Sequence, residues 1–421
     1  MAGLSFAIAL TRQWDPEITP PEITIYDRDS QQASIRRDGF SLSLAGHDDT
    51  GGLYALRQLG LLDATLRHAL LGLEGTPGCF KLWAGDFREL LSVRYKPAAG
   101  LPTAGIRIAR RDLRRVLLDA VEAAGGKFEI IWGAACVGAR NLDDGRVEVR
   151  LRRGTTTEQE EEEVVACDLV VAADGASSKL RSCLRPDDAA LRYAGAVQFG
   201  GSATFADGEA IPSPVGDNWG MLVSFRGVAC FLSPVDRHSV VWALSRSEER
   251  ERPPLDRNDP DHARKIVQEA LDLGSVFGEP FQTIVNKTDP ATVFSLPARD
   301  KEPFRHDVAR LGRVVFIGDS NHAASPFAGY GASLALKDGV DLAMQICAAK
   351  GEEREDGAGA GACGLERAVA AYDAVSVPRA LKVLGESHWR IKTSHSTGIL
   401  ALLFRCSIAV GGFMLWLTGQ S

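Results

Sequence analysis

The sequence lacks any cluster of cysteine or histidine of the kind that binds metal. Its eight cysteines are scattered, without a C-x-x-C pair, and no histidine stands near them at zinc-site spacing. We therefore expect no metal, and we interpret the cysteines as reduced, mostly buried thiols. This cysteine usage favours a reducing compartment and predicts a cytoplasmic protein.

A strong excess of one charge is also missing. The formal net charge is -7, from 48 Lys and Arg against 55 Asp and Glu, and both signs are spread along the chain. Composition therefore gives no support for general binding to nucleic acid or to an anionic membrane. With 421 residues, 45% of them apolar, the chain is long enough for two or three packed parts. A small molecule is the expected partner.

Apolar runs long enough to span a bilayer are absent as well. The carboxyl-terminal segments GILALLF and CSIAVGGFMLWLTG are apolar, but Arg405 separates them and each is too short to cross a membrane. We expect a terminal helix packed on the body, with membrane contact as the less favoured alternative. At the other end, MAGLSFAIAL lacks the basic stretch and cleavage site of a signal peptide and begins a predicted helix over residues 2–13.

The order of the remaining segments predicts an α/β protein. EITIYD is a short strand ending at Asp27, while LVVAA and RVVFI are continuous apolar runs, which are typical of parallel strands buried on both faces. Alternating segments later in the chain predict a second, sheet-rich domain. The expected parts are a first domain over 1–190 and 297–349, the sheet-rich domain over 191–296, a flexible linker over 350–364 and a helical carboxyl-terminal part over 365–421.

The segment GDSNHAASPFAGYGAS, from Gly318 to Ser333, carries the clearest chemical signal. It follows a buried strand and leads into a helix that begins near Gly331. Ligands of open α/β sheets bind at the carboxyl ends of the strands, where N–H groups of the next helix point at them. The Asp319 carboxylate can accept hydrogen bonds from sugar hydroxyls, and the helix start suits an anionic ring oxygen. Both features suit the ribityl chain and pyrimidine edge of a flavin.

Two further segments agree with this interpretation in order and spacing. DLVVAADGASSKLR ends a buried strand in Asp174 and Gly175, just before a helix start, although such a turn alone is as often structural as functional. The pattern R-x-D-L, at Arg110, Asp112 and Leu113, opens an amphipathic helix.

Together these segments resemble the para-hydroxybenzoate hydroxylase type of FAD-dependent monooxygenases. The family patterns G-D-x-x-H-x-x-x-P-x-x-G-x-G and A-D-G-x-x-S-x-x-R are matched from Gly318 to Gly331 and from Ala173 to Arg181. The resemblance implies a Rossmann-like FAD-binding domain with an inserted β-sheet substrate domain and a C-terminal helical part. It also implies FAD as cofactor, NADPH or NADH as co-substrate, and molecular oxygen transferred through a flavin hydroperoxide to an aromatic or polyketide-like small molecule.

The resemblance also assigns the flavin-binding residues. Asp319 would hold the ribityl hydroxyls, Gly331 and Ala332 would present N–H groups to the pyrimidine, and Arg110 would lie along the ribityl and pyrophosphate region. His322 we interpret as a packed, hydrogen-bonded residue rather than a base, so no catalytic residue is named. The full set of expected cofactor-binding residues is Gly3, Asp27, Arg37, Arg110, Asp174, Gly175, Gly318, Asp319, Pro326, Gly329, Gly331 and Ala332.

The phosphate and adenosine half of the site is less complete. Asp174 and Gly175 would lie near the pyrophosphate, Asp27 would accept hydrogen bonds from the adenosine ribose, and Arg37 is loosely matched to a family arginine. Gly3 aligns with the third glycine of G-x-G-x-x-G, but the family's first strand and first two glycines are not found before it. A start assigned at an internal methionine of a longer reading frame is our hypothesis, because loss of a central strand would expose sheet edges.

Substrate contacts are expected on the sheet-rich domain, within residues 199–205 or 219–225 or at Phe231. In the segment from Gly318 to Ser333, here called the flavin loop, Tyr330 and Ser333 stand where Gln and Asn are frequent in the family. Two other interpretations remain open. One is a related flavin halogenase or reductase, although VVWALS around Trp242 does not match the halogenase pattern W-x-W-x-I-P. The other is a flavin-fold protein that has lost catalysis and acts by binding.

Overall fold

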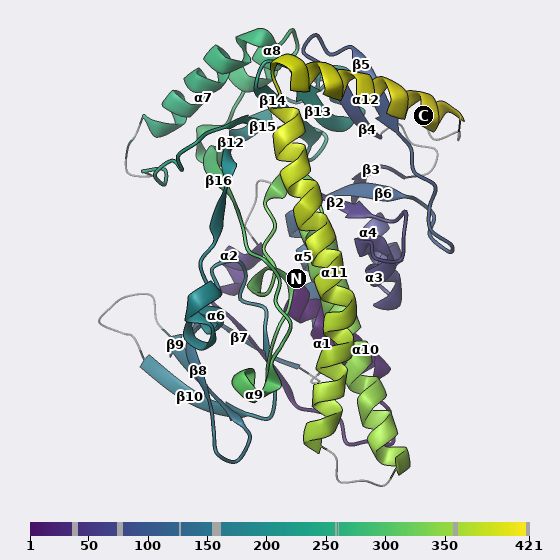
Figure 1. The fold of residues 1–421 in the computed structure, drawn as a ribbon, viewed down its shortest axis with the longest axis vertical. Helices are drawn as coiled ribbons and strands as arrows, with labels where there is room; N and C mark the ends of the chain where they lie inside the picture. The colour runs from purple at the N-terminus through teal and green to yellow at the C-terminus, as the bar shows by residue number, and fades with distance from the viewer. Residues whose placement is uncertain are drawn as a thin grey trace.

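The structure, a computed structural model, has two lobes, and one long helix runs along both (Figure 1). The lower lobe contains elements from both parts of the predicted FAD-binding domain, residues 1–190 and 297–349, and the upper lobe contains a large sheet. Helix α11 (Gly361–Ser394) runs along both lobes, and α12 (Gly398–Leu417) lies across the upper one. The structure describes residues 1–35, 41–73, 79–125, 128–153, 161–256, 259, 261–356 and 361–417.

Parallel strands in the lower lobe form two pairs. Strand β1 (Ile23–Asp27) pairs with β7 (Phe128–Trp132), and β11 (Val170–Ala172) pairs with β17 (Val314–Phe316). All three residues of β17 are buried, as predicted for a parallel strand covered on both faces. Within the described residues, no strand joins the two pairs.

Three helices pack around these strands. Helix α1 (Ala2–Gln13) has the predicted bounds and lies against α10 (Gly331–Asp356). Helix α5 (Arg110–Ala123) buries its predicted apolar face, which includes Leu113, Leu117 and Val121. These residues share one core with Leu336 and Val340 of α10. The smaller helices are α2 (Gln31–Ile35), α3 (Gly52–Gln58), α4 (Leu62–Leu66), α6 (Lys179–Leu184) and α9 (Val308–Leu311).

Two antiparallel sheets complete the lower lobe. One has the order β2 (Ser41–Ala45), β6 (Gly105–Ala109), β3 (Ala69–Leu71), and its central strand leads directly into α5. The other has the order β10 (Glu161–Cys167), β9 (Val147–Arg153), β8 (Ala134–Asn141). The predicted mixture of α/β and inserted sheet is confirmed.

The upper lobe is built on a seven-stranded sheet. Its order is β16 (Phe294–Asp300), β12 (Arg192–Thr204), β15 (Ser239–Ser247), β14 (Val228–Pro234), β13 (Trp219–Val223), β4 (Phe80–Ala84), β5 (Glu89–Val93). Strands β4 and β5 come from before residue 191, so the predicted range 191–296 holds only part of this sheet. Helices α7 (His262–Leu273) and α8 (Phe281–Asn286) cover one face, where Phe199 and Trp242 are fully buried.

The carboxyl-terminal part is helical, as predicted, but two details differ from expectation. Helix α10 continues to Asp356 and α11 begins at Gly361, so both described ends of the predicted flexible linker 350–364 are helical. The apolar segments on either side of Arg405, each expected to be too short to span a membrane, form one helix of 20 residues, because an arginine is a good helix former. Among the described residues, α12 is the one helix long and apolar enough to cross a membrane.

Candidate functional site

Backbone geometry at the end of β17 shapes the segment from Gly318 to Ser333. Gly318 has a φ of 59° and Gly329 a φ of 72°, left-handed values that favour glycine at both turns. Short 3₁₀ turns follow at Gly318–Ser320 and Pro326–Ala328, and α10 begins at Gly331. The N–H groups at the start of α10 are therefore presented beside the carboxyl end of β17, as the sequence predicts.

Solvent reaches the side chain of Asp319. Its side chain is exposed, but protein atoms crowd it, and the desolvation raises the pKa of its carboxyl. His322 and Arg110 are near enough to oppose this shift by their positive charge. No hydrogen bond to the Asp319 carboxylate occurs in the part of the chain that the structure describes. Such an accessible acceptor at the end of a buried strand fits a ligand that carries hydroxyl groups.

Open space borders the three turn glycines of the predicted site. A Cβ added at Gly175, Gly329 or Gly331 would meet no heavy atom within 4 Å. By contrast, a Cβ at Gly318 would lie 3.2 Å from the Cβ of Ala2, so that glycine is needed for packing. The residues present therefore fit a large group placed against Gly329 and Gly331, with Asp319 beside it.

A buried polar network holds this turn from behind. Asp338 of α10 accepts hydrogen bonds from the Gly318 N–H (2.8 Å), from Ser376 Oγ (2.9 Å) and from Arg379 Nη2 (2.8 Å). His322 Nε2 lies 2.5 Å from the same carboxylate, and the ring is 3% exposed. Burial opposes charge on both groups, but the pairing raises the pKa of His322 and lowers that of Asp338. His322 is thus part of a buried ion pair.

The A-D-G segment supports the same turn. The Asp174 carboxylate accepts hydrogen bonds from the N–H groups of Lys179 (2.9 Å) and Leu180 (3.3 Å), so it caps α6. Arg181 is buried and donates to the carbonyls of Ser320 and Asn321, which belong to the turn after β17. The segment therefore brings the ends of β11 and β17 together. Gly175, at the open edge of this junction, has a φ of 82°.

Gly3, Asp27 and Arg110 lie around the start of α1. A Cβ at Gly3 would lie 3.3 Å from the Cβ of Ala173, which places Gly3 next to the A-D-G turn. Asp27 at the end of β1 accepts a hydrogen bond from Arg114 Nη2 at 2.7 Å, a partner that sequence reasoning missed. Arg110 begins α5 and interacts electrostatically with Asp319. Arg37 lies outside the described residues.

Comparison with known proteins decides the family. A family described as "FAD binding domain" matches residues 45–358. The protein named Monooxygenase cfoF, from Aspergillus candidus, is 43% identical over 397 residues, which cover 94% of this chain and 90% of that protein. The chain belongs to the FAD-dependent monooxygenases of the para-hydroxybenzoate hydroxylase type.

Other relatives agree with this assignment. The protein named FAD-dependent monooxygenase aptC, from Emericella nidulans, is 26% identical over 85% of this chain and 86% of its own length. HpxO of Klebsiella pneumoniae, solved with FAD and uric acid, has the same fold, with a TM-score of 0.71 at 19% identity over 100% of this chain and 93% of that one. PqsL of Pseudomonas aeruginosa follows with a TM-score of 0.66 at 17% identity, over 98% and 96%. FAD is accordingly the cofactor of this monooxygenase.

A buried arginine between the lobes of the monooxygenase was missed by sequence reasoning. Arg107 of β6 is 3% exposed and donates hydrogen bonds to the hydroxyls of Ser43 (2.7 Å) and Ser233 (2.9 Å), and to Ser41. Its guanidinium lies 5.4 Å from the ring centre of Phe231 on β14. No carboxylate pairs with it among the described residues, and burial lowers its pKa to about 9. Nothing in the strand sequence GIRIA distinguishes it from an exposed arginine.

A second missed group surrounds Tyr330 of the flavin loop. Its hydroxyl lies 3.3 Å from Nε2 of His47, whose ring stacks on Tyr95 with centres 4.6 Å apart. Burial raises the pKa of Tyr330 to about 12, so the phenol stays neutral. His47 follows β2, and this loop therefore contacts the flavin loop.

Side chains of the segments predicted to contact substrate lie on both faces of the upper sheet. Phe199 is buried on the face covered by α7 and α8, and Phe225 contacts Phe404 of α12. Phe231 is directed toward Arg107, on the face that meets the lower lobe.

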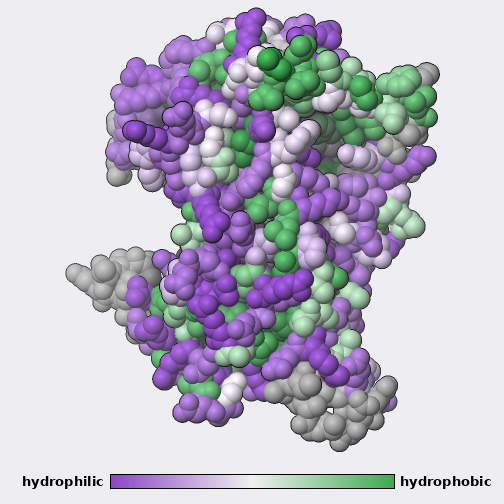
Figure 2. Space-filling model, viewed as in Figure 1, coloured by the Kyte–Doolittle hydropathy of each residue, from purple (hydrophilic) through white to green (hydrophobic). Residues whose placement is uncertain are grey.

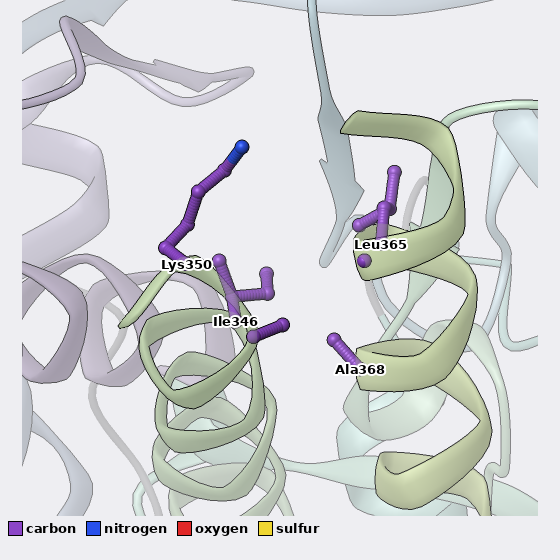
Figure 3. Close-up of a pocket in the computed structure, with 6 residues that line it drawn as sticks. Ile346, Lys350, Leu365 and Ala368 are labelled. Carbon is purple, nitrogen blue, oxygen red and sulfur yellow. The ribbon is translucent and has the colours of Figure 1, made fainter. Parts of the chain in front are cut away.

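Two pockets lie away from this site. The cavity in Figure 3, between the ends of α10 and α11, is lined by Ile346, Lys350, Leu365 and Ala368 and has a volume of about 30 Å³. That is room for about one water molecule. Another, of about 310 Å³, lies by Arg252 and His262 on the outer side of the upper lobe.

Proposed function

We propose that this monooxygenase uses NAD(P)H and molecular oxygen to hydroxylate an aromatic or polyketide-like small molecule in the cytoplasm. The open space bounded by Asp319, Gly329 and Gly331 carries the proposal. Phe327 of the same loop packs on Ala196 of β12, so this space adjoins the substrate-domain sheet. The names of the similar proteins support the reaction type: two are fungal monooxygenases, and another, from Klebsiella pneumoniae, is a urate hydroxylase.

The residues that would hold FAD lie around one edge of the lower lobe. Asp319 would accept from the ribityl hydroxyls with Arg110 beside it, and the N–H groups of Gly331 and Ala332 would face the pyrimidine edge. Gly3, Asp174 and Gly175 would lie near the pyrophosphate, and Asp27, already paired with Arg114, would meet the adenosine ribose. Bound there, FAD would take reducing equivalents from NAD(P)H and activate molecular oxygen.

The protein would contribute the partial positive charge of a helix start and the fixed position of its N–H donors. The start of α10 carries about half a positive charge, and its N–H groups stabilise negative charge on the ring edge that they face. The buried network behind Gly318 holds these donors in place, so little reorganisation is needed when charge develops. The packing of the flavin loop on the substrate-domain sheet, through Phe327 and Ala196, would help to exclude water from this space.

Arg107 and Phe231 support an aromatic substrate with an acidic hydroxyl. A positive charge without a carboxylate partner, held in a low-dielectric interface, lowers the pKa of a nearby phenol. The phenolate is the electron-rich form that accepts an electrophilic oxygen atom. The aromatic ring of Phe231 offers an apolar surface at the same interface.

The test uses the full chain loaded with FAD. NADPH oxidation and oxygen uptake are measured with a panel of phenols, naphthols and urate, under isotopically labelled molecular oxygen. We expect stimulation of NADPH oxidation by at least one phenolic compound and labelled oxygen in its product. A product that is reduced without gaining oxygen would indicate a reductase instead. The Asp319→Ala variant should lose FAD affinity about ten- to a hundredfold, because a hydrogen bond to a charged group contributes about 1.5–3 kcal/mol.

A further inference from the structure

Helix α12 presents an apolar stripe to solvent. Ile399, Leu402, Leu403, Val410 and Leu417 are between 57% and 78% exposed. At about 100° per residue these five side chains fall within an arc of about 100° on one side of the helix. Figure 2 shows hydrophobic residues gathered over this part of the upper lobe. Soluble proteins seldom leave a contiguous apolar stripe of this length uncovered.

The opposite side of α12 is fixed to the protein. Ala401 and Ile408 are buried, and Ile408 packs with Leu82 of β4 and Val223 of β13. Phe404 contacts the ring of Phe225, with centres 6.1 Å apart. The helix is therefore held flat against the upper lobe along much of its length. It cannot cross a bilayer in this position, although its composition would permit it.

Charge near the stripe favours anionic lipid. The last acidic residue of the chain is Glu386, and the 35 residues after it contain Arg390, Lys392 and Arg405 but no Asp or Glu, in a chain whose net charge is -7. Arg390 donates to the carbonyl of Ala328, so the exposed basic residues of this stretch are Lys392 and Arg405. Basic residues beside an apolar helix are attracted to anionic headgroups.

Arg405 occupies a position that suits a membrane surface. It lies at the edge of the anchored side of α12, where its guanidinium stacks over Phe225 at 5.1 Å from the ring centre. From there its charged end can stay in the headgroup layer while the outward stripe is immersed. Trp389, at the end of α11, is 57% exposed and contacts Phe404, and exposed tryptophan is common at this depth.

A protein partner fits the stripe less well than lipid does. Specific protein interfaces surround an apolar centre with a polar rim and carry about one hydrogen bond per 100–200 Å². Cys406 and Phe413 are also exposed within the same arc of α12, and apart from the weakly donating thiol of Cys406 its side chains offer no donor or acceptor to fix such a partner. The hydrocarbon part of a membrane requires no hydrogen-bond donor or acceptor from the protein.

We propose that α12 inserts its outward stripe into the surface of a membrane that contains anionic lipid and so holds the enzyme there as a monotopic protein. An amphipathic helix of this kind lies in the membrane plane, about 5–10 Å into the headgroup and acyl boundary. The sequence-based expectation of a helix merely packed on the body is thereby extended: one side packs on the body and the other meets lipid.

Flotation with lipid vesicles tests the proposal on the full-length, FAD-loaded chain. Vesicles of phosphatidylcholine alone are compared with vesicles that also contain phosphatidylserine, at low and high salt. We expect the protein to float with the mixed vesicles, and binding to weaken but persist at high salt, because only the electrostatic part is screened. The double variant Leu403→Glu and Val410→Glu should bind at least about tenfold less, since each loses more than 1.4 kcal/mol of apolar burial.

A matched control distinguishes the stripe from general hydrophobicity. Val375 and Leu381 are 46% and 49% exposed on α11, away from α12, and their double change to Glu should leave flotation unaltered. FAD absorbance and the unfolding temperature of each variant show that it is folded. Two results would overturn the proposal: wild-type protein that stays unbound with both vesicle types, or a detergent-free dimer in light scattering that the Leu403 and Val410 changes dissolve. The second result would assign the stripe to another copy of the chain.

Discussion

Asp338 on α10 accepts a hydrogen bond from the backbone N–H of Gly318, which begins the turn after β17 and precedes Asp319. Arg379, from the carboxyl-terminal helix α11, binds the same carboxylate at 2.8 Å and reaches Asp341 at 2.7 Å. The flavin-binding turn is thus connected through one buried carboxylate to a helix that contacts both lobes. Changes on α11 should therefore be felt at the cofactor site.

Loss of the Arg379 charge should be strongly destabilising. Its side chain is 9% exposed and Asp338 is fully buried, so an Arg379→Met variant removes a buried cation shared by two carboxylates and leaves Asp338 with His322, and Asp341 with Lys337, as the remaining charged partners. Breaking a buried pair in this way costs about 3–5 kcal/mol. Arg367→Met is the control, because Arg367 is 52% exposed and pairs with Glu352 at the surface, where a change within about 1 kcal/mol is expected. Urea unfolding of both variants measures the difference, and equal midpoints would contradict the prediction.

His322 should make stability depend on pH near neutrality. Although burial opposes it, the Asp338 carboxylate raises the pKa of His322 in the folded state above its ordinary value of 6.5. The folded state therefore holds the proton more tightly than the unfolded state does. This contribution is fully present below pH about 6.5 and is lost as pH rises through the folded pKa.

The free energy of unfolding, measured in urea across this range, should fall with rising pH for the natural sequence. In a His322→Gln variant the fall should be reduced, because glutamine does not titrate. His68, which is exposed, provides the comparison as His68→Gln. An unchanged slope for His322→Gln would mean that the buried pair does not hold its proton.

Sequence reasoning located the flavin turn because its signal is local. Strand, glycine, aspartate and helix start follow one another within Gly318–Gly331, and the backbone conformations at Gly318 and Gly329 confirm why glycines stand there. The N-terminal helix and α5 were predicted for the same reason, since their periodicity lies within one segment.

Long-range partners could not be found in this way. The hydrogen bond between Arg114 and Asp27 joins residues 87 positions apart in the sequence, and that between Arg107 and Ser233 joins residues 126 positions apart. No sequence motif marks either pair. The upper sheet takes β4 and β5 from far earlier in the chain for a similar reason: strand pairing is decided by the assembled core rather than by neighbouring residues. Arg405 was expected to separate two short apolar segments, and its position beside Phe225 is visible only in the fold.

Arg107 should contribute to activity as well as to stability. Its guanidinium is buried with hydroxyl and carbonyl partners in place of a carboxylate, and burial disfavours its charged form. Methionine cannot replace the hydrogen bonds to Ser41, Ser43 and Ser233, and a buried polar group left without its partner costs about 1–3 kcal/mol. For Arg107→Met we expect a loss of about this size in the free energy of unfolding and unchanged FAD affinity, but at least about a tenfold fall in kcat/KM for a phenolic substrate. A large loss of stability with full activity would assign Arg107 to structure alone.

The open space at Gly331 allows cofactor binding to be separated from folding. A Cβ at this position meets no heavy atom within 4 Å, and the residue does not need a positive φ, so Gly331→Leu should leave the apoprotein as stable as before or slightly more stable. The new side chain would occupy the space where the flavin edge is expected. FAD affinity, measured by fluorescence quenching, should therefore fall by at least about tenfold. Gly351 lies in the same helix with equally open surroundings but far along the chain from the turn, and Gly351→Leu is the matched control. If both variants bind FAD as tightly as the natural sequence, the flavin does not lie against the start of α10, and the position assigned to the cofactor is wrong.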